Sequence, residues 1–443
     1  MTFLWRRRGG RGAGAAGKKG APEGIKPSME LTVPTHFRCP ISLDLMKDPV
    51  SLSTGITYDR ESIEKWIDAG NFTCPVTNQV LRNFDQIPNH ALRKMIQDWC
   101  VEHKSYGVER IPTPRVPITP YEVSEVCARM SAAAHDGDEK KCQELVVKIK
   151  NSAKESERNK RCIVGNDIGA ALADMFETFA RFSVEKHENL LKETLSALTW
   201  SFPLGQEGVS KLNSAVSLRC MARFLKDEDL SSRQTAIFVL KQLILEDQGC
   251  VDGLVEIEGI EETLFRIVKV PICPKATQAC LVVIHHMMLL QEKSPMITLR
   301  FVQLGLIPLI LDILVDGNKS MCEKALGVLD RVCDLEEGRE SAYTNALTVP
   351  LLVKKILRVS NTATAFSIST LWKLSLGETS ENALVEAVEL GAFQKLLVVL
   401  QVGCGERTLK DKVTELLKMM NLYRDKLDCF DSSQGFKYLK RSY

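Results

Sequence analysis

Apolar side chains recur at helical spacing along most of this chain of 443 residues, from Tyr121 to about residue 430. Strict alternation of apolar and polar residues, which would indicate half-buried strands, is absent from that stretch. One apolar-rich motif returns along it, and its fourth positions recur every 42 to 45 residues at Trp200, Gln242, His286, Arg331 and Lys373. A helical repeat of this length cannot bury its apolar face alone, so the pattern predicts an all-α superhelical solenoid over residues 121–430.

A smaller unit with a different pattern precedes the repeats, over residues 31–108. A short helix that begins near Asp59 places three apolar side chains on one face: Ile63, Trp66 and Ile67. A second helix over residues 91–100 carries a stripe that we expect to pack back on the same domain: Leu92, Met95, Ile96 and Trp99. The stretch predicts a small α+β domain, and the protein is therefore expected to be multidomain.

Three polar segments flank these two domains. Residues 1–30 consist largely of Gly, Ala, Arg and Lys, and we expect a disordered basic tail because so few apolar groups cannot form a core. An organelle transit peptide or a nuclear signal is the alternative. Residues 109–120 carry proline at every second or third position, which favours a stiff, extended interdomain linker. Residues 431–443 are predicted to form a polar C-terminal tail.

Composition narrows the classes of function. The net charge of +2 does not indicate attraction to nucleic acids or membrane surfaces, so we expect no nucleic-acid partner. No apolar run approaches the roughly 18 to 20 residues that a membrane span needs. The 14 cysteines include no C-x2-C pair, which argues against a disulfide scaffold and a zinc site. This usage fits a reducing compartment, and we expect a cytoplasmic or nuclear protein.

Two short motifs in the first domain resemble half-sites for zinc. Cys39 is followed by Ser42, and Cys74 by Thr77, each at the spacing at which a second cysteine would complete a zinc-binding pair. Hydroxyl groups are poor zinc ligands, so we predict neither a metal nor a cofactor. A buried and fully satisfied polar network is expected to hold the loops instead. Its candidate members are Ser42, Asp44, Asp59, Arg60, Glu61, Asn71, Thr77 and Asn78.

The same stretch resembles the U-box, a zinc-free relative of the RING finger that occurs in E3 ubiquitin ligases. The resemblance rests on Cys-Pro-Ile-Ser at 39–42, Cys-Pro-Val-Thr at 74–77, Trp66 and the segments 37–43, 48–50, 54–60 and 87–89. With the helical repeats, which resemble armadillo repeats, the chain is most similar to plant U-box/armadillo ligases, especially their elicitor-responsive, defence-related subgroup. This resemblance implies a U-box followed by an armadillo-repeat solenoid.

The resemblance also implies a docking surface for the ubiquitin-conjugating E2 enzyme. Carried over by motif position, its residues are Ile41, Leu43, Trp66, Pro75, Val76 and Asn78. The alternative for Ile41, Leu43 and Trp66 is that they are core residues of a small domain. Many ligases of this kind have Arg where Asn78 stands, and this difference puts the strength of E2 activation in question.

Structural roles are implied for a second set of U-box residues: Cys39, Ser42, Asp59, Arg60, Cys74 and Thr77. The alternative for Cys39 and Cys74 is that they are catalytic thiols that accept ubiquitin. Neither has a histidine at a spacing that would supply an activating base. We therefore expect buried structural thiols and no covalent nucleophile.

The repeat positions identify a candidate substrate groove. In importin-type armadillo proteins, an Asn at this position of successive repeats holds a peptide backbone. None of the five positions here (Trp200, Gln242, His286, Arg331 and Lys373) is Asn, which argues against a nuclear-import receptor. Arg331 and Lys373 would favour an acidic partner, although a charged exposed face is common on any helix.

These expectations combine into one hypothesis and two rivals. The protein is predicted to be a U-box E3 ubiquitin ligase whose partners are an E2 enzyme, ubiquitin and a protein substrate bound by the repeats. A role in plant stress or defence signalling follows only from the resemblance, and homodimerisation through the helix at 91–100 stays open. The rivals are a scaffold with a catalytically weak U-box and an armadillo adaptor for transport or adhesion.

Overall fold

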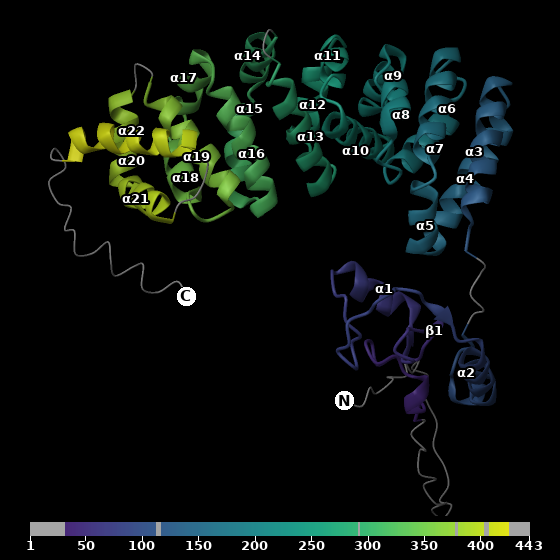
Figure 1. Ribbon diagram of the computed structural model, residues 1–443. Coiled ribbons are helices and arrows are strands. Elements are labelled where there is room, and N and C mark those ends of the chain that lie inside the picture. The colour runs from purple at the N-terminus through teal and green to yellow at the C-terminus, as the bar shows by residue number, and fades with distance from the viewer. Residues whose placement is uncertain (1–31, 112–116, 291–292, 377–379, 403–406, 425–443) are drawn as a thin grey trace, which may run out of the picture. The chain divides into compact units, whose positions relative to one another are not determined.

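The computed structural model describes residues 32–111, 117–290, 293–376, 380–402 and 407–424 (Figure 1). The predicted tails at 1–30 and 431–443 lie outside these residues, as do residues 112–116 of the predicted linker. The chain divides into two compact units between Val116 and Pro117, and each is described by itself.

The N-terminal unit is built around a small antiparallel sheet. Its strand order is β2–β1–β3, so that Val50 at the centre of β1 pairs with Tyr58 on one side and Pro88 on the other. The strands are β1 (Pro49–Ser51), β2 (Thr57–Asp59) and β3 (Ile87–Pro88). The helices are α1 (Arg60–Asp68) and α2 (His90–Glu102), with single 3₁₀ turns at Thr35–Phe37 and Lys104–Tyr106. This is the small α+β domain that the sequence predicts.

The core of this unit lies between the sheet and the two helices, where Tyr58, Ile63 and Ile96 are fully buried. The predicted stripe on α2 is wrong at Met95, which is 51% exposed. The buried side of α2 runs through Ile96 and Cys100 instead. Periodicity fixes the width of such a stripe, but its centre depends on where the sheet contacts the helix.

The C-terminal unit is an array of α-helices in which triplets repeat. An opening pair, α3 (Pro120–His135) and α4 (Glu139–Glu155), precedes six triplets. The triplets are α5 (Glu157–Val164), α6 (Ile168–Phe182) and α7 (Glu188–Leu198); α8 (Gly205–Leu212), α9 (Ala215–Leu225) and α10 (Leu230–Glu246); α11 (Cys250–Val255), α12 (Ile260–Lys269) and α13 (Pro274–Met287); α14 (Ser294–Leu304), α15 (Leu306–Asp316) and α16 (Lys319–Val332); α17 (Glu336–Thr344), α18 (Thr348–Lys355) and α19 (Asn361–Leu374); and α20 (Ser380–Glu389), α21 (Ala392–Val402) and α22 (Arg407–Arg424).

Helix α3, the first of the array, begins at a proline. Pro120 occupies the first turn of α3, where its missing N–H would have no intrahelical partner. Thr119 and Glu122 form a capping box, in which the Glu122 carboxylate accepts a hydrogen bond from the Thr119 N–H at 2.8 Å.

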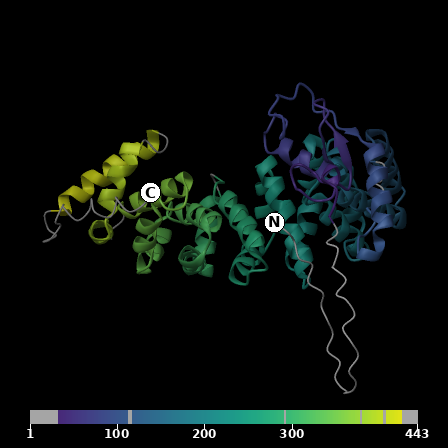
Figure 2. The same cartoon turned by 90° about the horizontal axis from the view of Figure 1, so that it is seen from below.

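The third helices of successive triplets form the spine of the array. Each packs on the next, from α4 through α7, α10, α13, α16 and α19 to α22, and one continuous core extends from Val123 to Met420 (Figures 1 and 2). Because each repeat buries its apolar face against its neighbours, the array is the solenoid that the 42- to 45-residue spacing predicts. No single helix among the described residues is long and apolar enough to cross a bilayer, and the pair α14–α15 reaches that length only with a bend of 73°.

Lys373 joins two adjacent spine helices. It is only 7% exposed, and its Nζ lies 2.6 Å from the Asp330 carbonyl oxygen, 2.8 Å from Asp330 Oδ1 and 2.7 Å from Asp334 Oδ1. The ammonium group thus donates a hydrogen bond to the Asp330 carbonyl and forms ion pairs with two carboxylates. The prediction that Lys373 lines a substrate groove is therefore contradicted, because its ammonium group is buried and paired with carboxylates of the array itself.

Replacing Lys373 by methionine should destabilise the solenoid strongly. The substitution keeps most of the length of the side chain but leaves the 4%-exposed Asp330 without its cation. Breaking a buried pair in this way costs about 3–5 kcal/mol. Arg300→Met removes one partner of the exposed Arg300–Glu262 pair, which should cost below about 1 kcal/mol. Urea denaturation followed by circular dichroism measures both free energies. Equal losses in the two variants would contradict this account of Lys373.

Candidate functional site

Two loops of the N-terminal unit have the same backbone structure. In the first loop (residues 39–44) the Cys39 N–H donates to the Asp44 carbonyl, and the Leu43 N–H donates to the Cys39 carbonyl, both at 2.8 Å. In the second loop (residues 74–79) Cys74 bonds to Gln79 and to Asn78 in the same pattern, again at 2.8 Å. The two Cys-Pro motifs therefore build equivalent turns.

Each loop contains one residue in the left-handed region, at the position four after its cysteine. These are Leu43, with φ of 62°, and Asn78, with φ of 56°. Asparagine tolerates this conformation, whereas leucine is strained in it by roughly 1–3 kcal/mol. Leu43 is also 69% exposed, so the strain is not offset by burial of its side chain. A strained, exposed apolar residue is a candidate for a binding contact.

Hydrogen bonds to the two cysteine sulfurs hold the loops against the sheet. Cys39 and Cys74 are fully buried. The Asp59 N–H donates to Cys39 Sγ at 3.3 Å, while the Tyr58 and Thr54 hydroxyls lie 3.0 and 3.4 Å from Cys74 Sγ. Nowhere in the described parts of the chain do three potential metal ligands from His, Cys, Asp and Glu converge.

Tyr58 connects the second loop to strand β2. Its buried hydroxyl contacts Cys74 Sγ and accepts a hydrogen bond from the Val76 N–H at 3.3 Å. Burial raises the pKa of the Cys74 thiol, but hydrogen bonds from Thr54, Thr77 and Tyr58 outweigh burial and lower that pKa to about 6. Burial, followed by the bond to Cys74, raises the pKa of Tyr58, so the phenol keeps its proton and serves as the donor.

A second polar cluster joins the segment after the first loop to both helices. The Asp59 Oδ1 accepts hydrogen bonds from the N–H groups of Lys47 and Asp48, at 2.8 and 2.9 Å. The Asp48 carboxylate in turn pairs with Arg60 of α1, at 2.7 Å, and with Arg93 of α2. These side chains are only partly exposed, and the cluster ties the segment after the first loop to β2, α1 and α2.

The predicted buried network is therefore only partly correct. Asp59 and Arg60 belong to it, and Asn71 donates to the Trp66 carbonyl at 3.1 Å. The remaining candidates (Ser42, Asp44, Glu61, Thr77 and Asn78) are exposed. Ser42 and Thr77 make local turn bonds, each accepting from the N–H two residues later at 3.4 Å, and Thr77 also bonds to the Cys74 thiol. Tyr58, Asp48 and Arg93 were not predicted as members, because their partners lie 16 to 45 positions away and no local spacing links them.

The residues carried over as E2 contacts lie on and beside the two loops. Leu43 and Val76 are 69% and 51% exposed, Asn78 is exposed, and Ile41, Trp66 and Pro75 are half-buried. The Trp66 indole N–H donates to the Thr73 carbonyl at 2.9 Å, which holds the ring beside the second loop. Ile41 and Trp66 also pack on the domain core, as the core alternative expects, and their contact with E2 stays a prediction.

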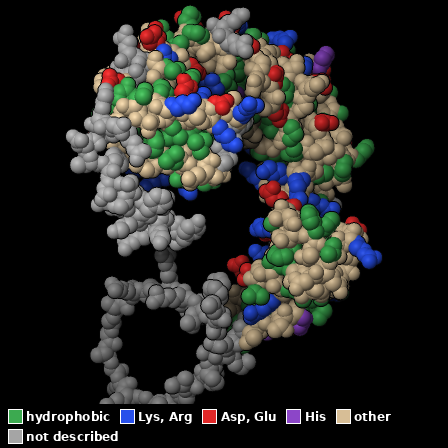
Figure 3. Space-filling view, turned by 60° about the vertical axis from the view of Figure 1, so that its left-hand side comes forward, with side chains coloured by type: hydrophobic (Ala, Val, Ile, Leu, Met, Phe, Trp, Pro, Cys, Tyr) green, Lys and Arg blue, Asp and Glu red, His purple; other side chains and the backbone are tan. Residues whose placement is uncertain are grey.

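The other four groove candidates of the solenoid are half-buried. Gln242, His286 and Arg331 lie near the ends of α10, α13 and α16, and Trp200 follows α7 and packs on the core. His286 Nδ1 lies 2.8 Å from the Val282 carbonyl oxygen, and Arg331 pairs with Asp334 at 3.2 Å. Acidic, basic and apolar side chains all occur on the visible face of the molecule (Figure 3).

Comparison with protein families gives two matches that together cover most of the chain. The U-box domain matches residues 33–105, and the plant U-box protein ARM repeat region matches residues 122–440. The chain belongs to the plant U-box proteins with armadillo repeats. The first match includes both Cys-Pro loops and the helix between them.

Relatives of this U-box protein extend over its full length. U-box domain-containing protein 21 of Arabidopsis thaliana is 48% identical, and the alignment covers 100% of both chains. E3 ubiquitin-protein ligase PUB23 of the same plant is 33% identical over 88% of this chain and 93% of its own. The family and its curated ligases show that this U-box protein is an E3 ubiquitin transferase.

A solved structure shows the same solenoid fold. The crystal structure of an engineered protein, 13% identical, aligns with a TM-score of 0.51 over 68% of this U-box protein and 71% of its own chain. At this identity the likeness concerns the fold alone.

Replacing Tyr58 by phenylalanine should lower the stability of the U-box and make that stability depend less on pH. The change leaves the Val76 N–H without its acceptor and removes one of the hydrogen bonds to the Cys74 sulfur, at a cost of about 1–3 kcal/mol. An unfolded thiol has a pKa of about 8.5, so stabilisation by the Cys74 thiolate is complete above that pH and is lost as the pH falls through about 6.

Thermal unfolding of the wild type and of Tyr58→Phe between those two pH values measures both effects. The wild-type U-box should become more stable as the pH rises, and the variant should show a smaller rise. A variant with unchanged stability at every pH would contradict the role of Tyr58. Tyr106→Phe, at an exposed position of the same unit, is the matched control.

Proposed function

We infer that this U-box protein binds a ubiquitin-charged E2 enzyme at its two Cys-Pro loops and promotes ubiquitin transfer to a protein recruited by its solenoid. The observation that carries this inference is Leu43, an apolar side chain held exposed in a strained conformation at the end of the first loop. Val76 in the middle of the second loop is exposed as well. Small interfaces draw most of their affinity from a few such anchors.

The ligase contributes position rather than a nucleophile. Cys39 and Cys74 are fully buried and bonded to the sheet, so neither thiol can reach a thioester. In the reaction a substrate lysine amine attacks the E2 thioester, an amide bond forms, and the E2 thiol leaves with the proton lost by the amine. Holding E2 and substrate together makes this attack effectively intramolecular, which is the contribution we assign to the two domains.

A scaffold with a weak U-box is the second candidate, and Asn78 is the observation that favours it. The Asn78 side chain is exposed and uncharged at the position where many related ligases have an arginine. The resemblance to the defence-related subgroup supports plant stress signalling as the context of either function.

Leu43→Ala should abolish most E2-dependent activity without unfolding the domain. The side chain is exposed and alanine has a similar backbone penalty at positive φ, whereas truncation of a central anchor costs about 2 kcal/mol or more, or roughly 30-fold in affinity. Autoubiquitination with E1, a panel of E2 enzymes, ubiquitin and ATP measures the effect. Val101→Ala on α2, 55% exposed in the wild type, is the control. Polyubiquitin formation at the wild-type rate by Leu43→Ala would refute the assignment.

Asn78→Arg tests the scaffold alternative. Asn78 is exposed at the end of the second loop, so the arginine side chain extends into solvent, while its backbone at a φ of 56° is strained by roughly 1–2 kcal/mol. A guanidinium group there can donate to carbonyl groups of both E2 and ubiquitin, so discharge of ubiquitin from E2 to free lysine should accelerate several-fold. Asn83→Arg, at another exposed position of the same domain, is the charge control. Equal rates in the two variants and the wild type would show that residue 78 does not limit activation.

A further inference from the structure

A hollow of about 320 Å³ lies between helices α6 and α9 of the solenoid. It is lined by the end of α6, the segment that follows it and one side of α9. Its residues are Ala180, Arg181, Val184, Val216, Arg219, Cys220 and Arg223. None of them belongs to the spine helices or to the predicted substrate groove, so this is a separate surface.

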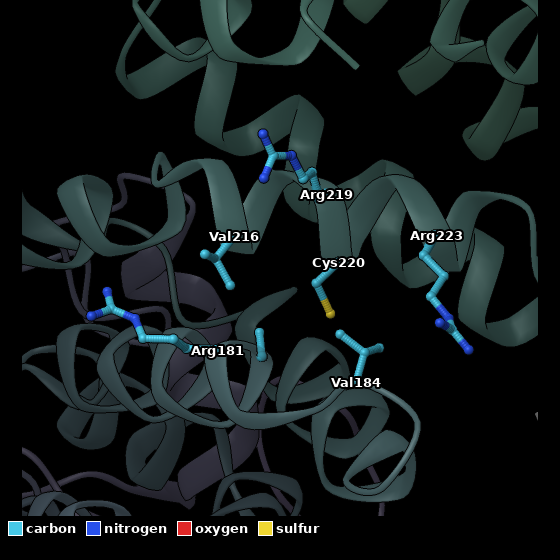
Figure 4. Close-up of a pocket in the computed structure, with 7 residues that line it drawn as sticks. Arg181, Val184, Val216, Arg219, Cys220 and Arg223 are labelled. Atoms are coloured by element: carbon cyan, nitrogen blue, oxygen red, sulfur yellow. The ribbon is translucent and has the colours of Figure 1, made fainter. Parts of the chain in front are cut away.

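The floor of the hollow is apolar. Val184, Val216 and Cys220 face the same space, and Ala180 and Cys220 are 7% and 2% exposed (Figure 4). Burial raises the pKa of the Cys220 thiol to about 12, so the sulfur is neutral and acts as a small apolar group. The volume is at the lower end for ligand pockets, enough for an apolar side chain but not for a large cofactor.

The rim of the hollow is positively charged. The arginines lie around the apolar residues, with Arg181 and Arg223 on opposite sides (Figure 4). Arg181 pairs with Glu177 at 2.8 Å, and Arg223 pairs with Glu185. Arg219 is exposed and has no acidic partner among the residues that the structure describes.

Acidic side chains of the solenoid pair with two of the three rim arginines, Arg181 and Arg223, and not with Arg219. Glu177 also lies 3.5 Å from Lys211, whose closer partner is Asp174 at 2.8 Å. A guanidinium has five N–H donors, and one carboxylate occupies at most two of them. Arg181 and Arg223 therefore keep donors for a further anion, and Arg219 keeps all of its donors.

We propose that this hollow binds an acidic peptide segment in which one apolar side chain is flanked by aspartate or glutamate. The apolar side chain would enter between Val184 and Val216, and the flanking carboxylates would bind the arginines. Glu177 and Glu185 show that this rim already accepts carboxylates from the chain itself. Recognition of acidic motifs by arginine clusters is a known mode of peptide binding.

The acidic segment would belong to a substrate protein that receives ubiquitin. Only this identification of the ligand as a substrate rests on the proposed function. Single-stranded nucleic acid is disfavoured because the hollow contains no aromatic side chain on which a base could stack.

Fluorescence anisotropy with the full-length chain tests the proposal. The probe is a short fluorescein-labelled peptide with a central leucine flanked on both sides by glutamates. Arg219→Glu should weaken its binding by about tenfold or more, since it replaces the unpaired cation by an anion. Arg407→Glu, the same change of charge at an exposed position of α22, should leave binding unchanged. Added salt should weaken the wild-type complex.

Three further peptides determine the chemistry of the ligand. Glutamine in place of the glutamates and serine in place of the leucine should each reduce binding. Equal binding of the glutamine peptide, or equal losses in Arg219→Glu and Arg407→Glu, would overturn the proposal. Tighter binding of a phosphoserine peptide would overturn the choice of carboxylates. Autoubiquitination by Arg219→Glu should match the wild type, which separates failure of this site from failure of the U-box and from misfolding.

Discussion

The hydrogen bonds received by two buried sulfur atoms join the two loops of the U-box to its sheet. Cys39 and Cys74 each lie at the start of a loop that backbone hydrogen bonds close. The bonds to their sulfurs come from strand β2 and the turn before it, so that one short segment anchors both loops. Such bonds are individually weak, but burial excludes water as a competitor and makes their loss costly.

The ion pairs of the N-terminal unit extend this constraint to the helices. Asp48 pairs with Arg60 of α1 and with Arg93 of α2. The pair with Arg60 orients α1, which is the helix beside the loops. The surface proposed for E2 binding is therefore formed by both loops and α1, and contacts with the sheet hold these elements in place. The strain at Leu43 persists only because the surrounding bonds determine the backbone there.

The solenoid uses its charged residues mainly to join its own repeats. Lys373 bonds back to α16, and Lys412 of α22 bonds to Ser369 at 2.8 Å and lies over the Trp372 ring at 4.9 Å. Positions that are open to partners in a peptide-binding armadillo groove are thus partly occupied here by contacts within the chain. The arginine rim between α6 and α9 differs from them because one of its cations has no partner within the described array.

Local chemistry allowed the sequence alone to determine much of this protein. Helical periodicity with a fixed repeat length specifies the solenoid, and the Cys-Pro motifs with Trp66 specify the U-box, because these signals depend on neighbours within a few turns or on a specific motif. Only the tertiary structure decided that Met95 faces outward and that Lys373 is buried. It also decided that Tyr58 bonds to the second loop and that Asp48 pairs with Arg93. Each of these outcomes depends on contacts between residues far apart in the chain, such as Asp48 with Arg93 or Asp330 with Lys373, and no local pattern encodes such pairs.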